Sequence, residues 1–181
     1  MASAKKVEVN VILESDNPVR FRIEPVGKSI PVGPQGELIF YNDHHPGFHV
    51  WFYLQDPNDL GYLFPPNNKK HEAIWSELGS GSCPQPPGKS DVFHAERVLE
   101  PECTTLVVLN PNPSPAQGAF GYTLRVTKDR GATYLPLDPG GLNQNGPQSR
   151  FTTTGAFVAG AAVGAVAGSV ATLGVQAMMG G

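Results

Sequence analysis

The residues best suited to bind a metal ion lie in one short stretch of the sequence, at Asp43, His44, His45 and His49. Imidazole and carboxylate groups are the usual protein ligands of zinc and copper, and His71 or His94 could complete such a site. The same stretch, residues 42–47, is also typical of a polar hairpin turn, because it ends in a Pro-Gly pair. We favour the turn and expect neither a metal ion nor any other cofactor.

The chain shows none of the sequence motifs that carry common catalytic chemistry. It has no G-x-S-x-G turn, no glycine-rich phosphate loop, no HExxH motif and no paired carboxylates at a telling spacing. Cys83 and Cys103 lie 20 residues apart without a CxxC motif, which argues against a zinc ribbon or a thioredoxin-type redox site. They would pair in an oxidising compartment and stay free thiols in a cytoplasmic domain. We therefore expect no enzyme, and no small-molecule substrate is identified.

Aromatic side chains are the strongest candidates for contact with a partner protein. They form either an exposed apolar patch or, more simply, part of the core, and they are Trp51, Tyr53, Tyr62, Phe64 and Trp75. The formal net charge of −3 at pH 7 lacks the basic excess of a nucleic-acid binder, so we expect no nucleic-acid partner.

Eighteen prolines and 21 glycines among 181 residues indicate many turns and hence an all-β body. Strand-like segments between turn residues occur at residues 7–13, 19–26, 37–42, 43–57, 73–78, 91–99, 104–110 and 120–128. The first two predict a hairpin, and residues 43–57, apolar on both faces, predict a central strand. Residues 56–72 are long enough for a binding loop or a covering flap. We predict a mainly β fold, a Greek-key β-sandwich over residues 1–130, followed by a Pro- and Gly-rich linker over residues 131–150.

Two stretches resemble the cupredoxin family. The run LIFYNDHHPGFHVWF, residues 38–52, looks like that family's strand ending in Phe-x-Asn, which leads to a His that opens the next strand. The run LVVLNPNPSPAQGAFGYTLRV, residues 106–126, is similar to that family's last hairpin. The resemblance covers about residues 7–128 and implies a cupredoxin-like or immunoglobulin-like sandwich. His49 matches the family's first copper ligand by position, but residues 111–119 hold no Cys, His or Met, so the resemblance implies the fold and not electron transfer.

Between Gly155 and Met179 the chain runs for 25 residues without a charge or a proline. A helix of this length extends about 37 Å, enough to cross a hydrocarbon core of about 30 Å with some tilt. The glycine ridge Gly160, Gly164 and Gly168 has the four-residue spacing along which membrane helices pack closely. We predict a single-pass C-terminal transmembrane helix within residues 151–181. A soluble oligomerisation helix and a flexible Gly/Ala tail remain as alternatives.

The expected function follows from this arrangement. The N-terminus lacks the apolar run of a secretory signal, and Arg150 precedes the predicted helix with no charge after it, so we expect a tail-anchored protein with a cytoplasmic β-domain. We predict a non-enzymatic, membrane-anchored subunit that docks through its β-sandwich loops and packs its helix against copies of itself or other transmembrane helices of a larger complex. The alternatives are a copper- or zinc-binding cupredoxin-type protein and a soluble self-assembling structural protein.

Overall fold

The computed structural model of the chain describes residues 4–33, 36–41, 47–79, 84, 87–112 and 118–144. These residues form a mainly β structure with one short 3-10 helix, η1 (Asn67–Glu72). The strands are β1 (Lys5–Asp16), β2 (Val19–Pro25), β3 (Leu38–Tyr41), β4 (Phe48–Gln55), β5 (Ile74–Leu78), β6 (His94–Leu99), β7 (Thr105–Asn110), β8 (Gly118–Val126), β9 (Leu135–Leu137) and β10 (Gly140–Gln144).

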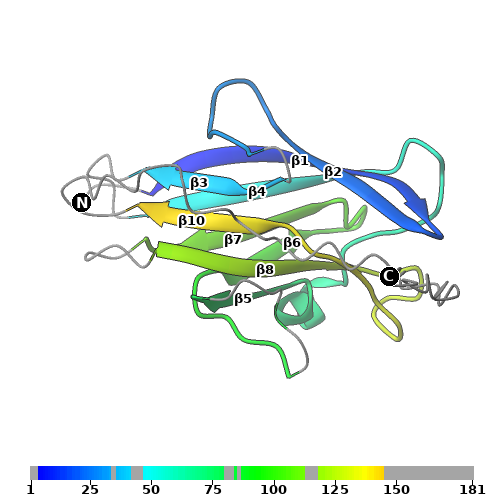
Figure 1. Cartoon of the computed structure of the whole chain (residues 1–181). Coiled ribbons are helices and arrows are strands. Elements are labelled where there is room, and N and C mark those ends of the chain that lie inside the picture. Colours follow the sequence, from blue (N-terminus) through cyan, green and yellow to red (C-terminus); the bar gives the residue numbers. More distant parts are fainter. Residues whose placement is uncertain are drawn as a thin grey trace, which may run out of the picture.

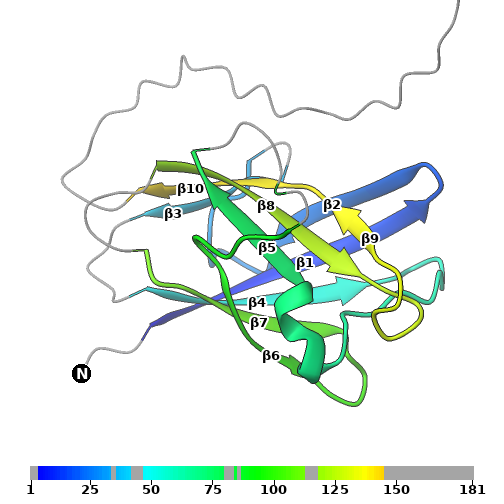
Figure 2. The same ribbon diagram turned by 90° about the horizontal axis from the view of Figure 1, so that it is seen from below.

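The strands are arranged in two sheets that pack face to face (Figure 1). Sheet A has the order β2-β1-β4-β7-β6, and sheet B has the order β3-β10-β8-β5, with β9 paired to β8. Figure 2 shows β3, β8 and β10 as a layer above β1, β4 and β7. Aromatic rings join the layers, since Phe52 of β4 lies 6.2 Å from Tyr122 of β8, centroid to centroid. The prediction of a mainly β, sandwich-like fold is confirmed.

Strand β4 lies at the centre of sheet A, as the sequence predicts. It pairs in parallel with β1 and antiparallel with β7. Its inward residues, Phe48, Val50, Phe52 and Leu54, are all buried, whereas the residues between them are partly exposed. The predicted hairpin of β1 and β2 is also present. The central strand therefore carries one core face and one outer face.

The core between the sheets is built around Phe93, which lies just before β6 and is fully buried. Its ring meets four aromatic neighbours edge-on, at centroid distances of 5.3 Å for both Phe120 and Tyr122, 6.0 Å for Phe40 and 6.1 Å for Phe52. Edge-to-face contacts at such distances stabilise aromatic pairs beyond simple burial. Phe93 thus links sheet A to sheet B.

Two predictions about the chain after residue 104 are wrong. Residues 135–137 and 140–144, expected within a linker, form β9 and β10, and both strands pair with β8. Residues 106–126 do not form a hairpin, because β7 belongs to sheet A and β8 to sheet B. The last six residues of the predicted linker and the predicted transmembrane helix, residues 151–181 with Gly160, Gly164 and Gly168, lie outside the described residues. In the described part of the chain, no helix is long and apolar enough to cross a membrane.

The long excursion over residues 56–72 covers the edge of sheet A. Its helix η1 begins at Asn67, whose side-chain oxygen accepts a hydrogen bond from the amide of Val98 in the edge strand β6, at 3.1 Å. Leu63 pairs with Thr127 beyond the end of β8. Of the two roles expected for this segment, the contacts describe a covering flap.

Asp129 organises the turn between β8 and β9. Its carboxylate accepts hydrogen bonds from the Thr127 hydroxyl at 2.6 Å, from the amides of Ala132 and Thr133, both at 2.9 Å, and from the Thr133 hydroxyl at 2.7 Å. These donors, the Thr127 hydroxyl foremost, hold the pKa of the Asp129 carboxyl far below its ordinary value of 3.8.

The depressed pKa of Asp129 predicts a specific loss of stability in acid. A carboxyl whose pKa is lower in the folded state stabilises the fold above its unfolded pKa, and this contribution disappears as the pH falls toward the folded pKa. At neutral pH, the wild type should therefore need more denaturant for unfolding than Asp129→Ala. The gap between the two midpoints should narrow below about pH 4. A gap that stays constant from about pH 7 to pH 2 would contradict the assignment.

Candidate interaction surface

The aromatic residues predicted to contact a partner occupy four different places in the structure. Phe64 is 1% exposed and belongs to the core, so the prediction of a partner contact is wrong for this residue. Trp75 lies on β5 and is 8% exposed. Tyr62 lies in the covering excursion, where Lys128 stands 4.4 Å above its ring and its hydroxyl reaches Asp16 at 3.3 Å. Trp51 and Tyr53 share the outer face of β4.

A layer of charged and aromatic side chains covers the outer face of sheet A around Trp51. We name it the Trp51 layer, and its members are Lys6, Glu8, His49, Trp51, Tyr53, Glu96 and Arg97. Strand alternation places them there, because Val7 and Val9, or Val50 and Phe52, turn the other way into the core. The layer therefore spans the sheet from β1 through β4 to β6.

The Trp51 indole is held between two cations. The Lys6 ammonium lies 4.5 Å and the Arg97 guanidinium carbon 5.4 Å from the ring centroid, both within the range of cation–π attraction. Val107 pairs with Trp51 on one side and with Arg97 on the other, and it is only 1% exposed although it points to the outer face. We infer that the Trp51 and Arg97 side chains cover Val107. Trp51 therefore has a fixed position while its indole stays partly exposed.

Glu8 connects the cationic and aromatic parts of the layer. Its Oε1 atom accepts hydrogen bonds from the Tyr53 hydroxyl at 2.6 Å and from the Lys6 ammonium at 2.7 Å. Lys6 first and Tyr53 second hold the pKa of the Glu8 carboxyl below its usual value. Burial and the bond to Glu8 raise the pKa of Tyr53. At neutral pH Lys6 is therefore positively charged, Glu8 negatively charged and Tyr53 neutral, and these are the charges beside Trp51.

His49, one of the candidate metal ligands, belongs to the Trp51 layer. Its Nε2 atom lies 3.4 Å from Oε1 of Glu96, which sits at an irregularity of the β6 pairing between Ala95 and Arg97. His71 lies on η1 and His94 is exposed at the start of β6. Among the described residues no three His, Cys, Asp or Glu side chains stand close enough to hold a metal ion. Asp43, His44 and His45 lie outside these residues.

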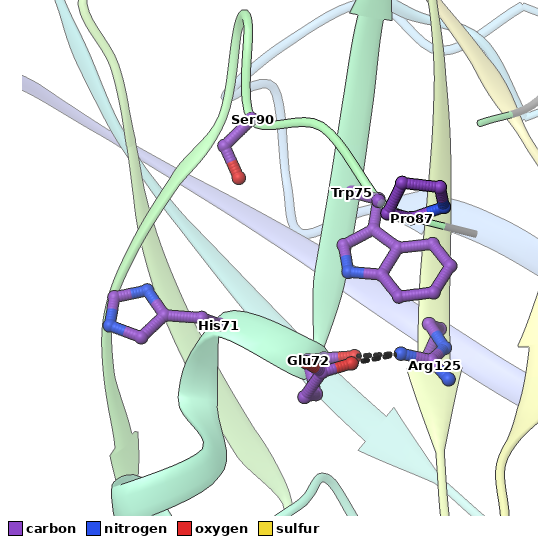
Figure 3. A pocket seen from close by; sticks show the side chains of 7 residues that line it. His71, Glu72, Trp75, Pro87, Ser90 and Arg125 are labelled. Carbon is purple, nitrogen blue, oxygen red and sulfur yellow. Dashed lines mark hydrogen bonds and ion pairs between the residues drawn. The ribbon is translucent and has the colours of Figure 1, made fainter. Parts of the chain in front are cut away.

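Trp75 borders a cavity of about 510 Å³ on the outer side of sheet B (Figure 3). Helix η1 contributes His71 and Glu72 to its wall, and the segment before β6 contributes Ser90. Gly88 lies directly against the Trp75 indole, since a Cβ atom at Gly88 would stand 2.1 Å from the ring. Only glycine fits at this position while the indole keeps its place.

Arg125 of β8 fills the side of this cavity. Its guanidinium carbon lies 3.7 Å from the centroid of Trp75 and 3.9 Å from that of Tyr134, and its Nη1 atom forms an ion pair with Glu72. The dashed line in Figure 3 marks this ion pair. Because the guanidinium is stacked, paired and largely buried, its charge is already satisfied by the protein. The arrangement holds η1 and Tyr134, which lies just before β9, against β8, and the Arg125 charge is not free for a ligand.

Cys103 is a buried free thiol, and burial raises its pKa, so the reactive thiolate form is disfavoured. Cys83 lies outside the described residues.

Comparison with known proteins gives no indication of what this surface binds. No protein-family model matches the chain, and no curated protein matches it. The Trp51 layer combines Trp, Tyr and Arg, the residue types that dominate protein–protein hot spots, on the outer face of one sheet. The candidate residues named from the sequence do not include four members of this layer, Lys6, Glu8, Glu96 and Arg97. The alternation of residues 5–9 points to the first two, whereas Arg97 reaches Trp51 only through a cross-strand register that the sequence does not reveal.

Proposed function

We propose that this protein is a non-enzymatic interaction subunit of a larger membrane assembly, docked to a partner protein through the Trp51 layer. The single observation that supports the proposal best is the fixed, partly exposed Trp51 indole between Lys6 and Arg97. A rigid aromatic anchor loses little conformational entropy when a partner covers it, and its flanking charges exclude mismatched partners. The docking face is thus a sheet face rather than the loops expected from the sequence.

The membrane attachment in this proposal depends on the sequence of residues 151–181. The uncharged stretch from Gly155 to Met179 would anchor the protein, and the glycine ridge at Gly160, Gly164 and Gly168 would pack against other transmembrane helices. The β-domain would then face the cytoplasm. We also propose that the sandwich is cupredoxin-like, because Phe40 lies in β3 and His49 is the second residue of the next strand, β4.

Cross-linking and fractionation of cells that express the full chain would test the proposal. We expect the protein in the membrane pellet after an alkaline wash, with one co-purifying partner. Trp51→Ala should weaken that partner's binding about 30-fold or more, the effect of losing a tryptophan hot spot, and should leave the membrane fraction unchanged.

The matched control is Leu78→Ala, which removes an exposed apolar side chain from β5 in sheet B. It should leave partner binding unchanged. Equal binding by wild type and Trp51→Ala would refute the docking face, and release of the protein by the alkaline wash would refute the anchor. A stoichiometric copper or zinc ion in the purified full chain would instead favour the metal-binding alternative.

A further inference from the structure

Strand β2 is the sheet edge that the described part of the chain leaves open. The other three edge strands are each covered by a neighbouring segment. In β6 the amide of Val98 donates a hydrogen bond to the side chain of Asn67. In β5 the amide of Ser76 donates to the carbonyl of Lys89, and in β3 the amide of Ile39 donates to the carbonyl of Pro31. On β2 the amide of Val26 donates to the carbonyl of Glu8 at 2.9 Å, just beyond the strand. No described residue bonds to the opposite edge of β2.

The hydrogen bonds between β1 and β2 show which backbone groups of β2 point toward its open edge. Hydrogen-bonded and non-hydrogen-bonded pairs alternate along an antiparallel ladder. Because Val26 bonds to Glu8, the pairs Glu24–Asn10 and Arg22–Ile12 are the hydrogen-bonded ones. The N–H and C=O groups of Phe21 and Ile23 therefore point away from β1, toward the open side.

We propose that β2 pairs antiparallel with β2 of a second copy of this chain, about a two-fold axis at Arg22, so that sheet A continues across two molecules. In this register Phe21 faces Ile23 of the second copy, and the two residues exchange both backbone hydrogen bonds. The same pair occurs again on the other side of the axis. Every outward N–H and C=O group of Phe21 and Ile23 thereby gains a partner.

On either side of the axis, where the two Arg22 residues face each other, the side chains of β2 are complementary in this register. On the outer face Arg20 stands opposite Glu24 of the second copy, as a non-hydrogen-bonded pair, in which side chains approach most closely. Arg20 has no ion-pair partner within the described residues, whereas Arg22 has two, Glu14 at 3.0 Å and Glu24. On the inner face Val19, 41% exposed in the single chain, gains contact with Pro25 of the second copy. The pairing therefore satisfies the unpaired cation and covers an exposed apolar side chain.

Neighbouring registers of the same parity are less favourable. A shift by two residues in one direction places Arg20 opposite Arg22 at two positions, so that like charges face each other twice. The proposed register has one such contact, between the two Arg22 residues at the axis, and each of these is already paired with Glu14 and Glu24 of its own chain. A shift in the other direction places Phe21 opposite Pro25, which has no amide hydrogen to donate. Of these registers, the proposed one is the one in which Phe21 and Ile23 exchange both backbone hydrogen bonds on each side of the axis.

Disulfide trapping of the full chain in detergent micelles would test the pairing, with all variants carried in a Cys83→Ser background in which the buried Cys103 is the remaining native thiol. At the axis, the two Arg22→Cys residues would have Cα atoms about 4.5 Å apart, within the range of a disulfide. We expect a dimer on non-reducing gels that disappears with reductant.

Arg20→Cys is the matched control, because it removes the same charge from the same face of β2. Its two copies would lie about 14 Å apart along the strands and should stay monomeric. Gly164→Leu should not change trapping at Arg22→Cys, which separates this contact from any packing of the proposed membrane helix. Loss of trapping in Gly164→Leu, equal trapping at both cysteine positions, or trapping only to a different protein would overturn the proposal.

A charge exchange gives a second, independent readout. In the Arg22→Cys background, Arg20→Glu and Glu24→Arg should each reduce self-trapping about tenfold, because each places like charges opposite one another at both ends of the interface. Mixed together, the two variants should cross-link with each other, since every facing pair is then attractive. Absence of mixed dimers would also overturn the proposed register.

Discussion

Phe93→Ala should lower the free energy of unfolding by about 3–5 kcal/mol, the usual cost of removing a fully buried phenylalanine. The ring is 0% exposed and contacts four other aromatic rings from both sheets, so no single neighbour can move to fill the space. Urea unfolding followed by tryptophan fluorescence would measure the change. A lower midpoint urea concentration, with an unchanged dependence of the unfolding free energy on urea, reports a change in stability alone.

Leu99→Ala is the control for this prediction. Leu99 is 36% exposed at the end of β6, so its truncation should cost well under about 1 kcal/mol. Phe93→Leu should fall between the two, because it keeps part of the volume. A cost for Phe93→Ala no greater than that for Leu99→Ala would show that the aromatic cluster does not hold the sheets together.

The strands of the sandwich could be predicted where burial alternates along the chain. In β1 the valines at 7, 9 and 11 are all fully buried, and the residues between them are more exposed, so a period of two is visible in the sequence itself. The same holds for β4, whereas in β8 the residues from Phe120 to Leu124 are all buried and only the apolar alternation of the sequence indicates the strand. Strands β9 and β10 could not be predicted in this way, because they are short and lie among Pro and Gly. Their pairing with β8, not their composition, makes them strands.

The candidate surface could be predicted only in part for a related reason. Trp51 and Tyr53 are two residues apart on one strand, so their shared face follows from the sequence. Arg97 comes close to Trp51 only because β4, β7 and β6 are adjacent, with Val107 between them. Phe64 could not be assigned to the surface or to the core from the sequence, because an aromatic residue among prolines gives no sign of whether it points inward. Cross-strand neighbours depend on the sheet order, and local patterns do not contain that order.

A buried hydroxyl group on β5 helps to hold the segment before β6 between the two sheets. Ser76 of β5 is fully buried, and its Oγ atom accepts hydrogen bonds from the amides of Val92 at 3.0 Å and Phe93 at 2.8 Å. Its backbone also pairs with this segment, through bonds from its amide to Lys89 and from the amide of Asp91 to its carbonyl. The side chain of Ser76 therefore positions the residue at the centre of the aromatic cluster.

Ser76→Ala should consequently cost about 2–4 kcal/mol, far more than its small change in volume implies. The substitution leaves two buried amides without an acceptor, and each unsatisfied buried donor costs about 1–3 kcal/mol. Hydrogen exchange should become faster at Val92 and Phe93 before other core amides respond, which a general loss of stability would not produce.

Ser90→Ala is the matched control, since Ser90 is exposed and meets Ser76 only as a backbone bridge. It should leave both stability and exchange at Val92 and Phe93 unchanged. If Ser76 acts by holding Phe93 in place, the double variant should lose less unfolding free energy than the sum of the losses in Ser76→Ala and Phe93→Ala. The reason is that a Phe93 side chain that has been removed no longer needs to be positioned. Strict additivity would mean that the hydroxyl stabilises the segment independently of the ring, and the aromatic cluster would then not depend on this bond.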